Sequence, residues 1–161
     1  FFDSKSNDLF VISVNDIDNK LNAYILSNNP TFDKPEFATD FDLENVNPYL
    51  NACKMFEKFG SKLKLLYVNM PNENFRSTVE IEQRIAEFLQ TADGNLDKIS
   101  DVAYQADYSV EQGVVNYSNK IGADLIAIPT HGRKGVTHFF AGSIGEDIAN
   151  HSELPVMTFK I

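Results

Sequence analysis

The sequence contains one cysteine, Cys53, and no tryptophan among its 161 residues. A single thiol cannot form an internal disulfide, so a disulfide-stapled fold is excluded. The three histidines, His131, His138 and His151, share no metal-ligand spacing, and we expect no metal site. No apolar run approaches the roughly 18 residues that a membrane helix needs. We expect a cytoplasmic globular protein that folds without disulfide or metal.

Basic residues are also scarce. The chain has 14 Lys and Arg against 23 Asp and Glu, for a formal net charge of −9. Nucleic acids and anionic lipid surfaces are bound by clustered Lys and Arg, and the sequence has no such cluster. The charge therefore argues against a nucleic acid or a membrane as partner. With 43% hydrophobic residues, a chain of this length can bury about two-thirds of its unfolded surface.

Glycine is missing from the first third of the chain. None of the eight glycines precedes Gly60, and four lie between Gly132 and Gly145. Because glycine permits tight turns and close approach to a ligand, this cluster is the first candidate for a functional site.

From residue 36 onward, short apolar runs alternate with amphipathic stretches. The pattern predicts strands at residues 36–39, 63–68, 101–106, 124–128 and 156–160, and helices at 46–59, 76–91, 109–122 and 143–152. Such alternation is typical of βαβ units with right-handed crossovers. We predict a doubly wound α/β fold with a five-stranded parallel sheet and helices on both faces.

Ligands of such sheets bind at the carboxyl ends of the strands, where the strand order reverses. Thr39 and Asp40 follow the first predicted strand, and residues 129–143 follow the fourth. In the second segment, Gly142 and Ser143 open a helix whose N–H groups and dipole would attract a phosphate. The spacing is neither that of a Walker loop nor that of a GxGxxG turn. It predicts an anion cradle.

Residues 36–161 resemble a universal stress protein domain of the ATP-binding branch of that family. The family's motif is Gly, two residues, Gly, nine residues, Gly, then Ser or Thr. Gly132 and Gly142-Ser143 match its second half, and Thr130-His131 match the usual filling of the first. Ala38-Thr39-Asp40-Phe41 resembles the family's first strand. The resemblance implies a Rossmann-like sheet of strand order 3-2-1-4-5 and a stress-response regulator that binds ATP or AMP, alone or with Mg²⁺. The sequence offers no carboxylate cluster to hold Mg²⁺ or position a base, so we expect a protein that is not an enzyme and hydrolyses ATP slowly at most.

The resemblance also implies roles for individual residues. Thr39 and Asp40 would contact the adenosine, and Val68 would line the base pocket. Ile128 and Pro129 would border the ribose and base. The phosphates would be surrounded by Thr130, His131, Gly132, Arg133, Gly142, Ser143 and Ile144.

Two positions depart from the family motif. Pro129 replaces the first glycine, and proline has no N–H to donate. Loss of one charge-assisted hydrogen bond weakens binding by about 10- to 150-fold. If the ring instead closes the pocket, the protein would be a nucleotide-free dimer that acts as a protein-interaction module. Gly145 stands where the family often has a hydroxyl residue, which would remove another phosphate donor.

Simpler interpretations remain open for three of these residues. Ser143 and Glu146 form a capping box, so the serine could serve only to start a helix. Asp40 could be a solvated carboxylate at a helix start. His131 could donate to the backbone of its loop.

The first 35 residues lie outside this domain. Residues 7–13 echo residues 123–129, which predicts a strand and suggests the degenerate tail of a preceding copy in a tandem protein; a coincidental extension is the other interpretation. We therefore divide the chain into 1–35 and 36–161. The last strand, Val156 to Ile161, is predicted at a sheet edge. The resemblance implies antiparallel pairing of this edge with a second domain, either in a homodimer or within one tandem chain.

Overall fold

The computed structural model describes residues 11–14, 32–131 and 143–161, and only the backbone of residues 11–14, 143 and 146. In chain order the elements are β1 (Val11–Val14), β2 (Pro35–Ala38), the 3₁₀ helix η1 (Leu43–Asn45), α2 (Val46–Glu57), β3 (Lys64–Asn69), α3 (Thr78–Ala92), the 3₁₀ helix η2 (Leu96–Asp101), β4 (Ala103–Ala106), α4 (Val110–Ile121), β5 (Leu125–Thr130), α5 (Ser143–His151) and β6 (Val156–Lys160). The predicted strands and helices from residue 36 onward are all present, with bounds shifted by a few residues.

The described strands form one parallel sheet in the order β1-β6-β5-β2-β3-β4. Counted from β2, the five strands of the predicted domain lie in the order 3-2-1-4-5, which confirms the predicted topology. A sixth strand, β1, pairs with the outer side of β6, with Val11 opposite Val156 and Val14 opposite Phe159. The strand predicted in residues 7–13 therefore exists, shifted to Val11–Val14.

The prediction that the last strand, Val156 to Ile161, lies at an edge of the sheet is wrong. β6 lies between β1 and β5, so its backbone groups are paired on both sides. Exposed strand edges seek partners, and the apolar VISV segment of β1 satisfies this one within the chain. Within the described residues the sheet edges are β1 and β4. β6 could therefore pair with a second domain only if β1 were first displaced from it.

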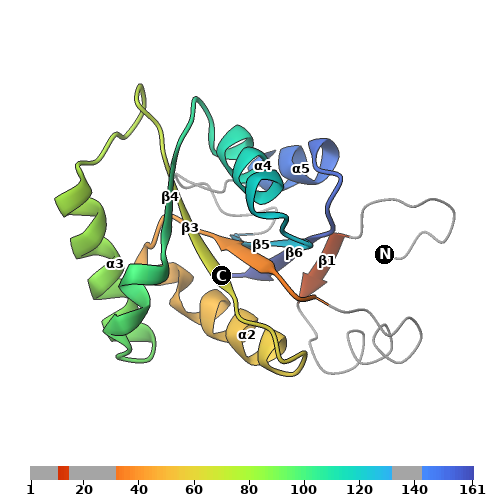
Figure 1. Cartoon of the computed structure of the whole chain (residues 1–161), viewed down its shortest axis with the longest axis horizontal. Helices are drawn as coiled ribbons and strands as arrows, with labels where there is room; N and C mark the ends of the chain where they lie inside the picture. Colours follow the sequence, from red (N-terminus) through yellow and green to blue (C-terminus); the bar gives the residue numbers. More distant parts are fainter. Residues whose placement is uncertain (1–10, 15–31, 132–142) are drawn as a thin grey trace, which may run out of the picture.

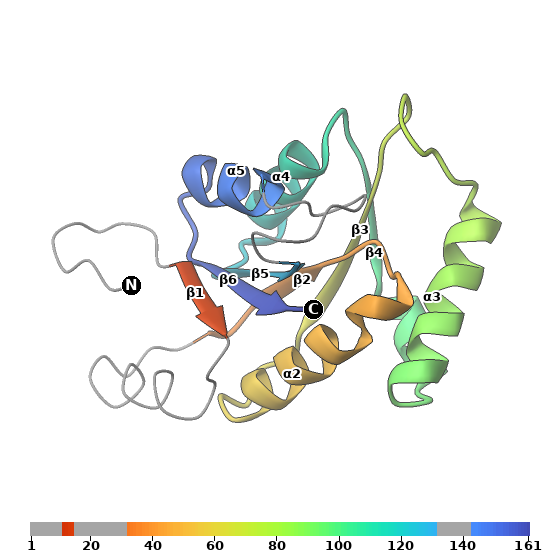
Figure 2. The ribbon, with the colours of Figure 1, turned by 180° about the vertical axis from the view of Figure 1, so that it is seen from behind.

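Helices cover both faces of the sheet, and each face has its own core. α2 and α3 cover one face, where Phe37 and Phe88 are fully buried. α4 and α5 lie together on the opposite face, where Val114 and Ile148 are fully buried (Figures 1 and 2). Strands covered on both faces become continuous apolar runs, which is why β5 is apolar along its length.

Local signals set the helix ends. Ser77 and Glu80 form a capping box at the start of α3, with the Ser77 N–H donating to Glu80 Oε2 over 2.8 Å. Ser109 Oγ accepts from the Gln112 N–H at the start of α4, as the spacing predicts. Gly122 ends α4 with a φ of 65°, a conformation that glycine adopts without strain.

Candidate functional site

The candidate site lies at the carboxyl ends of β2 and β5, the point where the strand order reverses. β2 continues into η1 and α2 on one face, whereas α5 lies on the other face (Figure 1). The two connections therefore part at this switch point, where ligands of such sheets bind; we refer to this place as the crevice and define it by the two segments that follow. Residues 39–42 form one side of it and residues 128–131 form the other.

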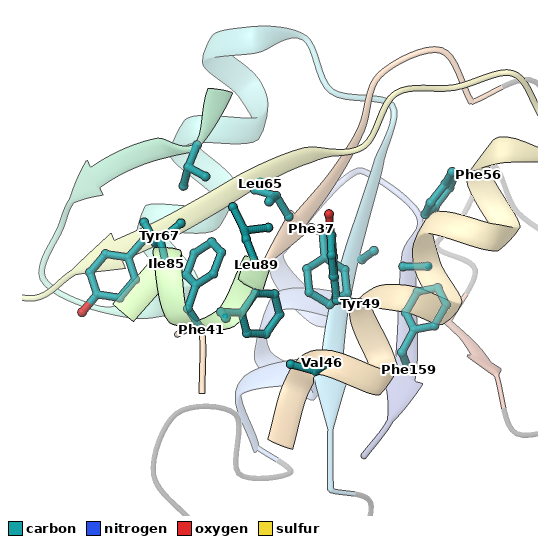
Figure 3. Close-up of a cluster of buried hydrophobic side chains, with 14 of the residues drawn as sticks. Phe37, Phe41, Val46, Tyr49, Phe56, Leu65, Tyr67, Ile85, Leu89 and Phe159 are labelled. Atoms are coloured by element: carbon teal, nitrogen blue, oxygen red, sulfur yellow. The ribbon is translucent and has the colours of Figure 1, made fainter. Parts of the chain in front are cut away.

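The loop after β2 is held in an unusual conformation. Phe41 has a φ of 58°, which a bulky residue adopts only when its surroundings enforce it. Its ring is buried and packs edge-to-face on Phe88 at 5.2 Å, close to Tyr67 (Figure 3). Thr39 Oγ1 accepts from the Phe41 N–H at 3.2 Å. The core thus anchors the loop by its aromatic residue.

Asp40 is turned into this loop. Its Oδ1 accepts from the Asp42 N–H at 2.9 Å and from Asn45 Nδ2 at 2.8 Å. Burial raises the pKa of the Asp40 carboxyl, opposed by the Asp42 hydrogen bond and the Arg84 charge. Oδ2 lies 3.7 Å from Arg84 Nη2, and the side chain is 14% exposed. Oδ1 is thus engaged within the loop, and Oδ2 is paired with Arg84.

Arg84, from α3, clamps the same loop. Its Nε donates to the Asp40 carbonyl at 2.7 Å, and its Nη2 donates to Asp42 Oδ2 at 3.0 Å. A guanidinium can make both bonds at once because its donors form a planar fork. Arg84 therefore fixes the backbone that carries the predicted nucleoside contact.

Replacing this clamp is expected to destabilise the fold measurably. Arg84→Met should lower the free energy of unfolding in urea by about 1–2 kcal/mol, since Arg84 is partly exposed and loses two charge-assisted bonds. Arg84→Lys should restore less than half of the loss, because an ammonium lacks the fork. Lys54→Met, at an exposed position of α2, is the control and should change stability by less than about 0.5 kcal/mol. Equal stabilities of Arg84→Met and the control would contradict the clamp.

On the other side of the crevice, β5 tolerates a proline because of its register. The Ile126 N–H donates to the Pro155 carbonyl just before β6, and the Thr130 carbonyl accepts from the Ile161 N–H just after β6. Alternation along a parallel strand therefore turns the backbone of Pro129 toward β2. The last residue of β2 paired with β5 is Phe37, opposite Ala127, so the missing N–H breaks no sheet bond. Pro129 is buried, and its N–H would have faced the crevice.

A side-chain contact ties the end of β5 to the 3₁₀ helix η1. His131 Nε2 lies 2.9 Å from Glu44 Oε1, and the imidazole is 17% exposed. This bond joins the two sides of the crevice. The sequence interpretation placed His131 beside phosphates, whereas in the structure its Nε2 contacts the Glu44 carboxylate.

The amino end of α5 packs directly over β5. A Cβ on Gly145 would lie 3.2 Å from Ile128 Cδ1 and 3.7 Å from Thr130 Cγ2. Gly145 therefore serves close packing, a physical reason for the missing hydroxyl at this position. Ile144, beside it, is half-buried. Ile128 is fully buried in the α4 and α5 core.

Val68, near the end of β3, is buried beneath α4. A Cβ on Gly113 would lie only 2.5 Å from Val68 Cγ1. Gly113 therefore lets α4 approach the sheet at the point where the base pocket was predicted. Val68 is 1% exposed, so its role there would be to shape the wall.

Comparison with known proteins places this geometry in a family. The family model described as "Universal stress protein family" matches residues 37–160. The chain belongs to the universal stress protein family. The match covers the five strands β2 to β6 and the helices between them. A search of curated proteins found no match.

Solved universal stress proteins share the fold. One, determined in complex with cAMP, has a TM-score of 0.55 and 14% identity, covering 81% of this chain and 98% of its own. One from Archaeoglobus fulgidus has a TM-score of 0.55 and 14% identity, covering 80% and 99%. A putative one from Pseudomonas aeruginosa has a TM-score of 0.52 and 16% identity; the match covers 81% of this chain but 48% of that one.

Part of the predicted universal stress protein motif lies outside the described residues. Gly132, Arg133 and Gly142 fall there, and Ser143 is described only by its backbone at the start of α5. The described part brings together the other predicted residues at one edge of the sheet: Thr39, Asp40, Val68, Ile128, Pro129, Thr130, His131 and Ile144.

Sequence reasoning missed three residues that shape the site, namely Glu44, Arg84 and Gly113. Arg84 and Glu44 act through partners 42 to 87 positions away, and no local pattern indicates such contacts. Gly113 did carry a signal, because a glycine inside a helix often marks close packing. Among the described residues, no group of three or more His, Cys, Asp or Glu side chains could hold a metal ion. No helix in this part of the universal stress protein chain is long and apolar enough to cross a membrane.

Proposed function

We propose that this universal stress protein binds an adenine nucleotide, ATP or AMP, in the crevice between β2 and β5 and acts as a stress-response regulator. The observation that carries the proposal is the convergence at the switch point. The anchored Thr39–Asp42 loop faces the end of β5, and the amino end of α5 packs over Ile128 and Thr130. Helix amino ends favour phosphate, and apolar strand ends favour a base.

The residue types at this site suit a nucleoside and its phosphates, except that Pro129 lacks the N–H that a glycine would donate. In this proposal Thr39 and Asp40 contact the adenosine, Val68 shapes the base wall, and Ile128 and Pro129 border the ribose. The phosphates lie against Thr130, His131, Gly132, Arg133, Gly142, Ser143 and Ile144. Glu44 and Asp42 add negative charge beside this path, which favours AMP over the more highly charged ATP unless Mg²⁺ accompanies it. We propose binding without rapid turnover.

A second candidate function rests on Pro129. Its ring is buried at the crevice and removes one N–H from the side that faces β2. If the ring occupies the nucleotide's place, the protein works without nucleotide, through its surfaces and its pairing with a second domain. That pairing, through β6, requires β1 to be displaced.

Substitutions within the motif should decide between the two functions. Isothermal titration of the purified protein is expected to show AMP and ATP binding, with Pro129→Gly binding about 10- to 150-fold tighter because the donor is restored. Gly142→Asp should abolish binding by adding bulk and like charge at the helix start. Gln83→Glu, which adds a charge at an exposed position of α3, should bind like the wild type.

Two results would contradict the proposed function. Denatured protein that releases no adenine nucleotide, with no binding by the wild type or by Pro129→Gly, would favour the interaction module. Release of phosphate from ATP and Mg²⁺ at several turnovers per minute would contradict binding without rapid turnover.

We also propose that residues 1–35 are the tail of a preceding copy of this domain. Its strand β1 corresponds in sequence to β5, because Asn7 to Ser13 echo Ala123 to Pro129. Val14-Asn15-Asp16 stands where Thr130-His131-Gly132 stands later, so this copy would not bind phosphate. The longer Pseudomonas aeruginosa relative, of which the match covers 48%, supports the tandem arrangement.

A further inference from the structure

A cavity of about 580 Å³ opens at the amino end of the sheet, remote from the crevice that holds Asp40. It lies between the second half of α2, the start of β3 and the 3₁₀ helix η2. Its volume is within the range of about 300–1,000 Å³ that is common for small-molecule sites. The proposed nucleotide function does not use it.

The floor of the cavity is apolar and partly aromatic. Phe56 of α2 and Leu65 of β3 are buried, and Tyr49 adds an aromatic ring (Figure 3). Cys53 and Leu63 are partly buried and complete the apolar lining. Aliphatic side chains and a polarizable sulfur atom such as that of Cys53 pack well on a flat ring. This lining favours an aromatic ligand.

One wall of the cavity carries the Lys98 ammonium, which can donate one more hydrogen bond than it makes within the protein. Lys98 Nζ donates to Tyr49 Oη at 3.0 Å and to the Asp93 carboxylate, and it lies 5.5 Å from the centre of the Tyr49 ring. Burial raises the pKa of the Tyr49 phenol to about 12, so the phenol stays protonated. An ammonium has three donors, and two are used by these partners. The third N–H can meet one acceptor on a ligand.

The charges around the cavity disfavour an anion. Lys62 and Lys98 stand against Glu57, Asp93 and Asp101, and both lysines are already paired with a carboxylate. An additional negative group would lie among three carboxylates, and would be repelled. The cavity thus differs from an anion site such as the one proposed at α5.

We propose that this cavity binds a neutral aromatic small molecule that carries one hydroxyl or carbonyl group, with that group accepting from Lys98 Nζ. The ring of the ligand lies against Cys53 and Leu63, which cover the buried Phe56, Leu65 and Tyr49. The site is independent of the nucleotide crevice, so neither AMP nor ATP competes for it.

The chain supplies its own reporter for a test, because Cys53 is the single cysteine and lines the cavity. The probes are 2-naphthol, which is neutral at pH 7, and 2-naphthoate, an anion of the same size. We expect 2-naphthol to slow modification of Cys53 by dithiobis(nitrobenzoate) in a saturable way, and 2-naphthoate to have at least about 10-fold weaker effect. Amide shifts of Leu65 and Lys98 in two-dimensional NMR provide a second readout, independent of thiol reactivity.

Two variants locate the binding. Lys98→Met should weaken 2-naphthol binding by about 10-fold, through loss of one charge-assisted hydrogen bond. Leu63→Trp should abolish it by filling the cavity, and also introduces the only tryptophan. Lys120→Met, at an exposed position of α4, is the matched control and should bind like the wild type.

Four outcomes would overturn the proposal. The first three are absence of saturable protection and of amide shifts with 2-naphthol, equal binding of 2-naphthoate, and unchanged binding by Lys98→Met. If Leu63→Trp is not folded by circular dichroism, Lys98→Met alone decides. Competition by AMP would show that the probe binds in the nucleotide crevice, and would also overturn the proposal.

Discussion

Glu36→Gln is expected to remove most of the pH dependence of stability between about pH 4.5 and pH 8 and to stabilise the protein at pH 8. Glu36 lies on the central strand β2, is fully buried, and accepts from Ser118 Oγ at 3.0 Å through Oε2. Oε1 has no hydrogen-bond partner among the described residues. Burial raises the pKa of Glu36 from 4.5 to about 8, against the opposing effect of the Ser118 bond.

The sign follows from proton binding. Between pH 4.5 and about 8 the folded state holds a proton on Glu36 that the unfolded state has released. Stability is therefore full below pH 4.5, falls as pH rises, on the order of 1.4 kcal/mol per pH unit, and reaches its minimum above pH 8. A glutamine has no proton to lose, so this slope disappears. At acidic pH the Glu36→Gln substitution should not raise the free energy of unfolding, because the wild-type side chain is then neutral too.

Urea unfolding from pH 5 to pH 9 measures this prediction. Glu87→Gln, at an exposed position of α3, removes one carboxylate without burial and should keep the wild-type slope. Glu36→Met, which leaves no unpaired atom of its own, should also lose the slope. A slope of unchanged size in both Glu36 variants would show that Glu36 is ionised in the folded protein.

Gly113→Ala is expected to destabilise the protein by about 2 kcal/mol, although alanine is the better helix former by about 1 kcal/mol. Its Cβ would lie 2.5 Å from Val68 Cγ1 and 2.9 Å from Cγ2. Val68 is β-branched and buried in a parallel strand, so it cannot rotate away cheaply. Overpacking of this kind typically costs about 1–3 kcal/mol.

A double-mutant cycle tests the contact itself. Val68→Ala alone should cost about 2 kcal/mol by leaving a cavity, and the double variant should cost clearly less than the sum, because each change makes room for the other. Gly122→Ala is the matched control: nothing lies within 4 Å of its Cβ, and its cost arises from a φ of 65°. Val68→Ala should not rescue it. Strict additivity of Gly113→Ala with Val68→Ala would contradict the close packing.

Most of the fold could be predicted from the sequence because its signals are local. The apolar run of β5 and the amphipathic pattern of α4 can each be recognised within a short stretch of sequence. Ser109 and Gly122 mark the two ends of α4. The echo of residues 123–129 in residues 7–13 predicted a strand near the one that the structure has at Val11–Val14. Its pairing with β6 was not predicted, because pairing joins residues 145 positions apart, as between Val11 and Val156.

The candidate site divides in the same way. Thr39, Asp40, Thr130 and His131 could be placed at one edge because each follows a predicted strand, and parallel strands end at the same edge. The contact of His131 with Glu44 across the crevice could not be predicted from the sequence. This contact depends on how two loops lie in space, which no spacing along the chain encodes.

The sequence by itself determined the βαβ order, the helix ends and the family to which residues 37–160 belong, since periodicity, capping residues and motif spacing are local properties. Only the tertiary structure decided that β1 covers the edge of β6, that Arg84 clamps the Asp40 loop, and that Glu36 is buried between two layers of helices. The raised pKa of Glu36 and the need for glycine at position 113 both depend on atoms that only the fold brings close to these residues.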